Sequence, residues 1–449
     1  MDNGIAAVNR HPPSATFPPR RILVRGTNWL GDAVMTTPAL LRLRERFPDA
    51  QITMLTKAKL ADLWKNHPAV DDVISFTEDE GVWSVAHRLR LESLKRFLET
   101  SPNRREAGRT ACQETAMKGG TPAQAVASVV TEVSKETIGS VQPARAHAPD
   151  LALILPNSPR SALEMFLARI PRRVGYARPW RNLFLTQAVA PRTEAVKMHK
   201  RSAAEVKQLV TADVNRPQES VSRVPPNIPA RAHQIHEYLH LVAALGANPE
   251  PLAPQLLVTS EEMEAARNKF GLPTLSRPVF GLNPGAEYGP AKRWPVERFI
   301  AAAQEIQKRT NCVWLIFGGK NDASTAAQLQ SAMGPGRGSA NRQSAVNLAG
   351  QTTLRELMAL LKLCRVLLTN DTGPMHVAAA LGTPVVAPFG STSPELTGPG
   401  LPGDPRHHLL KSEAPCAPCF RRECPIDFRC MNSLDAGRVV QAVIESTRS

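Results

Sequence analysis

Short apolar runs separated by amphipathic stretches recur along the first half of the chain. The runs have the length and composition of buried strands, and they cover residues 21–25, 51–56, 72–76 and 151–155. A helical pattern over residues 33–47 follows the first run, and Pro38 inside it predicts a kink. Strands that alternate with helices predict parallel βαβ units.

The same alternation restarts in the second half of the chain. Strand-like runs lie at Val279, Cys312, Val346, Val366 and Pro384. Thr353 and Glu356 have the spacing of a capping box that would open the helix before the run at Val366. The fold class is therefore predicted to be α/β, with two Rossmann-like halves and a ligand cleft at the carboxyl ends of the strands.

Two polar stretches interrupt this pattern. Residues 99–149 contain no aromatic side chain, and we expect an insertion there with one amphipathic helix near 123–136. Residues 215–229 form the second polar stretch, before a helix that contains Tyr238. The predicted organisation is a disordered tail (1–19), an N-terminal domain (20–251), a linker (252–276) and a C-terminal domain (277–449) with a Cys-rich loop (415–431).

The chain has a formal net charge of +15 and a pI near 9.9, which favours anionic partners such as a membrane surface or phosphorylated substrates. Nucleic acid is disfavoured as a partner because no zinc-finger spacing occurs and the chain has only three tyrosines. No apolar run approaches the roughly 20 residues needed to span a bilayer, and the first twenty residues contain no apolar secretory segment. We therefore expect a cytoplasmic protein.

A candidate phosphate site lies at residues 370–376, which read NDTGPMH between an apolar run and an alanine-rich helix. A strand, a tight turn and a helix N-terminus together offer backbone N–H groups and a helix dipole to a phosphate. Asp371 could orient a ribose or the turn, Thr372 could donate its hydroxyl, and His376 would face the same site. The alternative is a simple capped helix, since Asp and Thr are ordinary N-caps.

A second turn of this kind follows the run at residues 279–283. Gly285 would allow a close backbone approach, and Lys292 would supply a positive charge. Two such turns in one half of the chain are typical of a pyrophosphate clamp. The alternative for Lys292 is an ordinary solvated lysine.

Arginine is concentrated between residues 160 and 181, where six arginines accompany a single acid, Glu164. The stretch follows the carboxyl end of a predicted strand, and guanidinium groups suit phosphate and carboxylate. It is either an acceptor-binding surface or a solvated basic face.

Four of the seven cysteines form a CxxCxxxxCxxxxxC pattern: Cys416, Cys419, Cys424 and Cys430. Four thiolates can hold a structural zinc ion, and an iron–sulfur cluster is a less favoured use of the same ligands. The alternative is a loop of free or transiently bridged thiols. The remaining three are scattered, and Cys312 and Cys364 are expected to be buried, inert thiols.

With these motifs in order, the chain resembles glycosyltransferase family 9, the bacterial lipopolysaccharide heptosyltransferases. The resemblance rests on GTNWLGD, LPNSPRSAL, PGAEYGPAKRWP and NDTGPMHVAAALGTPVVAPFG, and it extends over nearly all the chain outside the first twenty residues and the two polar stretches. LPNS and PGAEYGPAKRWP favour the branch of the family that adds the second heptose.

The resemblance implies a GT-B architecture with an N-terminal acceptor domain and a C-terminal nucleotide-sugar donor domain. It implies inverting transfer of L-glycero-D-manno-heptose from ADP-heptose to the first heptose of the lipopolysaccharide inner core, without a metal or other catalytic cofactor. The absence of a DxD pair from the sequence agrees with this expectation.

The resemblance also assigns roles to residues. Asp32 matches the general base, although Asp at a helix start is also a common cap, and Lys292 is the second catalytic residue. The donor-binding set is Gly31, Gly285, Ala286, Glu287, Lys292, Asp322, Asp371, Thr372, Gly373 and His376. The acceptor-binding set is Asn28, Asn157, Arg160 and Arg173.

The expected partners are ADP-heptose and an acidic, lipid-linked acceptor, met by a monomer at the cytoplasmic face of the inner membrane. One alternative is a family 9 transferase with another acceptor, and another is a non-enzymatic, basic nucleotide- or RNA-binding protein. A nicotinamide dehydrogenase is disfavoured because the first turn lacks GxGxxG and no acid follows the second strand, where Thr56 and Lys57 stand.

Overall fold

The computed structural model describes residues 18–100, 148–214, 228–272, 277–334 and 344–448. The helix predicted at 123–136, nearly all of the tail and most of both polar stretches lie outside these residues. Within them, no helix is long and apolar enough to cross a membrane.

The first sheet is parallel and has the strand order β3-β2-β1-β4-β5-β6. Its strands are β1 (Arg21–Arg25), β2 (Gln51–Lys57), β3 (Asp72–Phe76), β4 (Leu151–Ile154), β5 (Arg172–Tyr176) and β6 (Gln187–Val189). The helices of this part, which we call the N-terminal domain, include α1 (Leu30–Met35), α2 (Thr37–Arg46), α3 (Val82–Thr100), α6 (Pro159–Leu167) and α8 (Ile235–Ala243).

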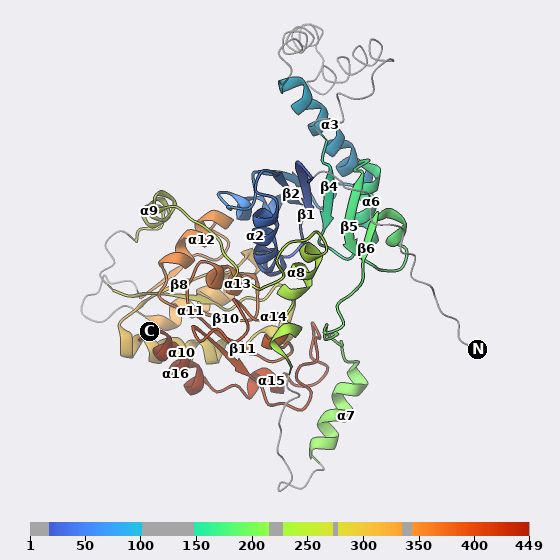
Figure 1. Cartoon of the computed structure of the whole chain (residues 1–449). Helices are drawn as coiled ribbons and strands as arrows, with labels where there is room; N and C mark the ends of the chain where they lie inside the picture. Colours follow the sequence, from blue (N-terminus) through green and yellow to red (C-terminus); the bar gives the residue numbers. More distant parts are fainter. Residues whose placement is uncertain (1–17, 101–147, 215–227, 273–276, 335–343, 449) are drawn as a thin grey trace, which may run out of the picture.

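Helices cover both faces of this sheet (Figure 1). Leu40 and Leu43 of α2 and Tyr238 of α8 pack in one core, whereas α3 and α6 bury Val85 and Met165 in the other. The helix predicted at 33–47 is divided at Thr36 into α1 and α2, because Pro38 occupies the first turn of α2. The kink expected at Pro38 is thus a break between two helices.

The second sheet is also parallel and has the order β12-β11-β10-β7-β8-β9. Its strands are β7 (Val279–Asn283), β8 (Val313–Ile316), β9 (Ala345–Asn347), β10 (Leu367–Thr369), β11 (Val385–Phe389) and β12 (His407–Lys411). The helices of this C-terminal domain include α10 (Val296–Thr310), α11 (Ala323–Met333), α12 (Leu354–Leu363), α13 (Gly373–Ala380), α14 (Pro394–Thr397), α15 (Arg429–Asn432) and α16 (Ala436–Ser446).

Most local predictions agree with these elements. The capping box is present, with Thr353 and Glu356 at the start of α12. Strands β5, β6 and β12 were not predicted: β5 begins with two arginines, β12 begins with two histidines, and β6 has three residues. Their polar or very short sequences carry no apolar run, so tertiary contacts decide that they pair.

Two segments connect the domains. Helix α9 (Ser260–Lys269) lies within the predicted linker, and its Glu262 forms an ion pair with Arg355 of α12. Helix α7 (Ala203–Val214) extends beneath the N-terminal domain in Figure 1. Its Val206 and Val210 pack against Cys416 and Cys419 of the Cys-rich loop.

Candidate active site

The contact between α1 and α13 places Asp32 where the two domains meet. A side chain at Gly31 would bring a Cβ to 2.7 Å from the His376 ring, and one at Gly373 would lie 2.9 Å from Leu30. Glycine at both positions lets the two helices approach closely. Gly31 and Gly373 therefore contribute close packing between the domains, and Asp32 follows directly on α1.

Lys292 and Asp371 form the centre of the donor-side residues. The Lys292 Nζ lies 2.6 Å from Asp371 Oδ2, and the Thr392 hydroxyl donates to the same oxygen at 2.6 Å. The Lys292 and Asp371 side chains are 14% and 4% exposed. The surface-lysine alternative for Lys292 is therefore wrong, because this lysine pairs with a buried acid.

Asn370 joins the two turns that were predicted to form a phosphate clamp. Its Oδ1 accepts a hydrogen bond from the Trp294 N–H at 3.0 Å, and its Nδ2 donates to the Pro284 carbonyl at 2.7 Å. Thr372 is the N-cap residue of α13, but its side chain makes no capping hydrogen bond. The simple cap that was the alternative for Thr372 is not formed.

Several groups act on the charge of Asp32. Burial raises the pKa of its carboxyl above the usual range, whereas a hydrogen bond from Gln234 Nε2 (3.2 Å to Oδ1) and the Lys292 ammonium lower it; the Asp371 carboxylate raises it. Burial also lowers the pKa of His376 to about 4, so this imidazole is neutral at pH 7. Asp32 thus has the raised basicity that suits a general base.

Asp322 lines a pocket beside these turns. The Gly319 N–H donates to its Oδ2 at 3.0 Å, and Arg293 lies 3.4 Å from its Oδ1. The pocket has a volume of about 300 Å³, and its walls include Pro284, Arg293, Trp294, Phe428 and Asn432. A Cβ on Gly285 would lie 2.4 Å from Asp322 Oδ2, so Gly285 is needed for Asp322 to occupy this position.

The other two predicted donor residues differ in position. Ala286 is buried. Glu287 is exposed, and its Oε1 lies 3.7 Å from the Lys59 Nζ of the N-terminal domain. Glu287 therefore faces the N-terminal domain across the domain boundary.

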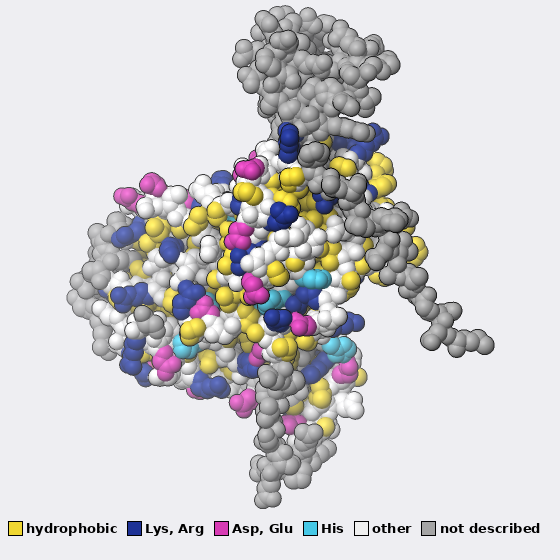
Figure 2. Space-filling model, in the orientation of Figure 1, with side chains coloured by type: hydrophobic (Ala, Val, Ile, Leu, Met, Phe, Trp, Pro, Cys, Tyr) yellow, Lys and Arg dark blue, Asp and Glu magenta, His cyan; other side chains and the backbone are white. Residues whose placement is uncertain are grey.

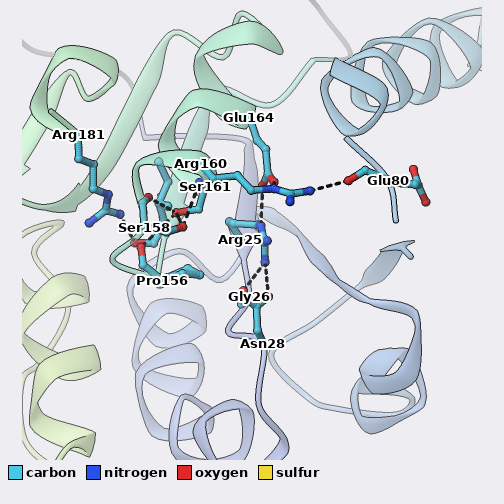
Figure 3. A network of polar contacts seen from close by, with 11 residues as sticks. Arg25, Gly26, Asn28, Glu80, Pro156, Ser158, Arg160, Ser161, Glu164 and Arg181 are labelled. Carbon is cyan, nitrogen blue, oxygen red and sulfur yellow. Dashed lines mark hydrogen bonds and ion pairs between the residues drawn. The ribbon is translucent and has the colours of Figure 1, made fainter. Parts of the chain in front are cut away.

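On the acceptor side, a buried ion pair organises the carboxyl ends of the strands (Figure 3). Arg25 Nε lies 2.8 Å from Glu164 Oε2, and these side chains are 4% and 0% exposed. Arg160 contacts the second oxygen of Glu164 at 3.2 Å, and Arg25 donates to Asn28 Oδ1 at 3.4 Å. Arg160 and Asn28 thus belong to one network near the turn that carries Asp32.

Arg181 contributes a second anchor. Its side chain is fully buried and donates to the carbonyls of Ile154 and Tyr176 and to Asn157 Oδ1 at 3.3 Å. The sequence analysis assigned neither Arg181 nor Glu164 to the site. Glu164 nevertheless stands out in the sequence, because it is the single acid among the arginines of residues 160–181. The arginines of this stretch differ in exposure: Arg181 is fully buried and bonded to backbone carbonyls, whereas Arg160 is half-exposed.

Arg173 lies apart from the other predicted acceptor-binding residues. It lies near the start of β5, at the opposite edge of the sheet from the strand ends that adjoin Asp32. Its guanidinium donates to the carbonyls of Phe184 and Ile170 at 2.6 and 2.5 Å. The reason is that the arginine run spans a whole helix and strand, so its members reach both edges of the sheet.

The cysteines of the Cys-rich loop are free thiols, and all but Cys424 are buried. Burial and the three neighbouring thiols raise the pKa of Cys430 to about 12. Among the residues that the structure describes, no three His, Cys, Asp or Glu side chains are grouped so that they could hold a metal ion. The geometry therefore gives no support to the zinc site predicted from the spacing of these cysteines.

The same loop contacts the donor turn. The Tyr288 hydroxyl donates to the Phe420 carbonyl at 3.0 Å, and the Ala291 N–H donates to the Arg422 carbonyl at 2.9 Å. The ring of Tyr288 in turn lies 4.9 Å from the Lys292 Nζ. The Cys-rich loop thus supports the segment that positions Lys292.

Comparison with known proteins agrees with this geometry. The family model described as "Glycosyltransferase family 9 (heptosyltransferase)" matches residues 221–428. The chain is 28% identical over 383 residues to lipopolysaccharide heptosyltransferase 2 of Salmonella typhimurium, covering 84% of this chain and 85% of that protein. It is 26% identical over 385 residues to lipooligosaccharide heptosyltransferase 2 of Haemophilus ducreyi, covering 84% and 86%.

Solved structures show the same fold. The E. coli ADP-heptose lipopolysaccharide heptosyltransferase II superposes with a TM-score of 0.64 at 24% identity, covering 95% of this chain and 98% of that one. A family 9 glycosyltransferase from Veillonella parvula gives a TM-score of 0.64 at 19% identity, covering 95% and 97%. The predicted GT-B fold is confirmed, and the chain is a glycosyltransferase enzyme that is similar to the heptosyltransferases of glycosyltransferase family 9.

Proposed function

We propose that this enzyme transfers L-glycero-D-manno-heptose from ADP-heptose to the first heptose of the lipopolysaccharide inner core, with inversion and without a metal. One observation carries the proposal: Asp32 lies on α1 of one domain, and α1 packs closely against α13 of the other, whose start adjoins the Lys292–Asp371 pair. The names of the similar proteins supply the donor and the type of acceptor.

The reaction needs one displacement. The acceptor hydroxyl oxygen attacks the anomeric carbon of the heptose as its proton passes to Asp32, and the bond from that carbon to the diphosphate oxygen breaks. Attack opposite the leaving ADP inverts the anomeric centre. Lys292 and the N–H groups at the start of α13 offset the charge that develops on the diphosphate.

Donor binding must rearrange the Lys292–Asp371 ion pair. The ammonium group lies 2.6 Å from the Asp371 carboxylate, so a diphosphate competes with that carboxylate for Lys292. The second partner of Asp371, Thr392, keeps a hydrogen bond to the acid when Lys292 turns toward the donor. Asp322 in the 300 Å³ pocket would then accept a hydrogen bond from the ribose.

The test is the variant Asp32→Asn, assayed by ADP release from ADP-heptose with a heptosylated Kdo₂-lipid A acceptor. We expect normal folding, ADP affinity near wild type and a rate lower by a factor on the order of 100 to 10,000, because the general base is lost. Asp62→Asn, which removes the carboxylate of a Lys65 ion pair elsewhere in the same domain, is the control. Turnover of Asp32→Asn within a few-fold of wild type would show that Asp32 is not the general base and serves only at the start of α1.

Two measurements address the finer points. The anomeric configuration of the product, determined by NMR, should be opposite to that of the donor. EDTA should leave the rate unchanged, and a loss that magnesium restores would contradict the metal-free mechanism.

A lipid-linked acceptor requires contact with a membrane, and one surface of the N-terminal domain suits it. Trp180, Leu183 and Phe166 are 80%, 73% and 45% exposed, and no Asp or Glu occurs at residues 165–193. Arg169 and Arg178 are exposed in the same stretch. Figure 2 shows hydrophobic side chains exposed on the side that carries α6, β5 and β6. We assign this surface to peripheral contact with the anionic, cytoplasmic face of the inner membrane.

Flotation with phosphatidylglycerol-containing vesicles tests that contact. The double variant Trp180→Ser/Leu183→Ser should bind these vesicles several-fold more weakly than wild type, and 0.5 M salt should weaken wild-type binding. Leu257→Ser, at an exposed leucine outside this surface, is the control. Equal binding by the double variant would rule the surface out.

A further inference from the structure

The segment that leads into α8 connects the candidate base to the other domain. The backbone N–H of Gln234 donates to the carbonyl of Leu396 in α14 at 2.9 Å. The neighbouring His233 contacts the Gly398 carbonyl through Nε2 at 3.0 Å. Gln234 is therefore held from the C-terminal domain, although its helix packs on the N-terminal domain.

The side chain of Gln234 reaches Asp32 from this fixed backbone. Its Nε2 lies 3.2 Å from Asp32 Oδ1 and 2.9 Å from the Tyr238 hydroxyl oxygen. A primary amide nitrogen has two hydrogens, so it can donate to both partners at once. Tyr238 lies one turn further along α8 and is buried in the core, so its hydroxyl fixes the amide plane.

We infer that Gln234 is a positioning residue for the transfer reaction: it donates to one oxygen of Asp32 and thereby directs the other oxygen toward the acceptor hydroxyl. The inference rests on the proposed role of Asp32 as the base. It adds a dependence on the domain contact, because the Gln234 backbone is held by Leu396. Separation of the domains at that contact would release the amide from Asp32.

The groups around Asp32 show how the hydrogen bond from Gln234 affects the pKa of the carboxyl. The charged groups that act on Asp32 are Lys292 and Asp371, and both belong to the C-terminal domain. His376 and Tyr238, the titratable groups packed nearby, are neutral at pH 7, since burial lowers the pKa of the first and raises that of the second. Gln234 is thus the one neutral donor among the groups that lower the pKa of the Asp32 carboxyl.

The variant Gln234→Leu removes the donor and keeps an aliphatic side chain of similar volume. We expect kcat to fall on the order of 10-fold, because a hydrogen bond to a charged group is lost, while KM for ADP-heptose stays within two-fold. The acid limb of the kcat/KM profile should move to higher pH, because the hydrogen bond that lowers the pKa of Asp32 is gone. Gln187→Leu, which removes an amide bonded to the Ala244 carbonyl in the same domain, is the control.

A double-variant cycle separates positioning from stability. In the Asp32→Asn background, Gln234→Leu should cause little further loss of kcat, because its effect acts through the carboxylate. A full additional 10-fold loss in that background, or an unchanged acid limb in the single variant, would overturn the inference. If Asp32→Asn itself stays active, the proposed base fails first, so the two failures are distinguishable.

A second variant tests the inference if Gln234→Leu does not give folded protein. Gln234→Glu keeps the size of the side chain and replaces the amide donor with a second carboxylate. It should move the acid limb further toward high pH and lower kcat more than Gln234→Leu would. An unchanged profile in folded Gln234→Glu would equally contradict the inference.

Discussion

At the scale of single residues, burial of the Asp32 carboxyl makes it more basic and also lowers the stability of the fold when the carboxyl is ionised. Because burial raises its pKa in the folded protein, the folded state holds the proton more tightly than the unfolded chain does. Its contribution to stability is therefore present below the pKa of an unfolded aspartate and is lost as pH rises through the folded pKa. Above the folded pKa, the ionised carboxylate is buried and destabilises the fold.

We therefore predict that Asp32→Asn raises the melting temperature at pH 7 by about 1–4 °C, although it lowers the rate of transfer. The gain should shrink as pH falls through the raised pKa of the folded carboxyl, and it should vanish below the pKa of an unfolded aspartate, about 3.9, where both states are protonated. Thermal unfolding of both proteins across this range measures the effect. A variant less stable than wild type at pH 7 would mean that the Gln234 and Lys292 contacts outweigh the cost of burial.

At the scale of elements, the ends of β1 and α6 depend on one buried ion pair. Glu164→Ala would leave Arg25 buried without its carboxylate, and we expect a loss of about 3–5 kcal/mol in the free energy of unfolding. Urea denaturation measures it. Glu45→Ala, which breaks the partly exposed Arg42–Glu45 pair, should cost less than about 1 kcal/mol. Similar losses for the two variants would show that the buried pair contributes no more to the free energy of unfolding than the partly exposed pair does.

The second element-scale prediction concerns the donor turn and the Cys-rich loop. A Cβ at position 289 would lie 2.5 Å from the Arg422 carbonyl oxygen, and the φ of 153° favours glycine there. Gly289→Ala should therefore displace the turn before Lys292 and weaken ADP binding by about 10-fold or more. Gly81→Ala, where a Cβ meets nothing within 4 Å, is the control.

Calorimetric titration with ADP compares these two variants with wild type. Equal affinities for all three would show that the loop contact does not position Lys292. Zinc and iron analysis of the same preparations, with titration of free thiols, decides whether the metal predicted from the cysteine spacing is present.

At the scale of the whole molecule, one apolar cluster runs through both domains and joins Leu43 and Tyr238 to Leu315 and Met375. We predict that deletion of residues 101–146 leaves the melting temperature within about 3 °C of wild type, because a polar, aromatic-free insertion adds little core and loop length costs little entropy. A collapse of the melting temperature would show that the insertion packs as a subdomain.

The sequence by itself determined most of the local structure. Strands such as Asp72–Phe76 and Val279–Asn283 were predicted with their observed bounds, because a buried strand is a short apolar run between turn residues. The two donor turns were predicted for the same reason. Their glycines and prolines indicate turns through local backbone preferences, whereas the close approaches that Gly285, Gly289 and Gly373 permit are to distant parts of the chain.

Only the tertiary structure decided which of these residues meet. Gln234 lies 202 residues from Asp32, and Arg25 lies 139 residues from Glu164, so no local pattern relates them. Arg160, Arg173 and Arg181 look alike in the sequence, yet one is half-exposed, one is tied to backbone at the far edge of the sheet and one is buried. The physical reason is that burial, pairing and the pKa of a side chain depend on packing between distant segments, which short-range periodicity does not encode.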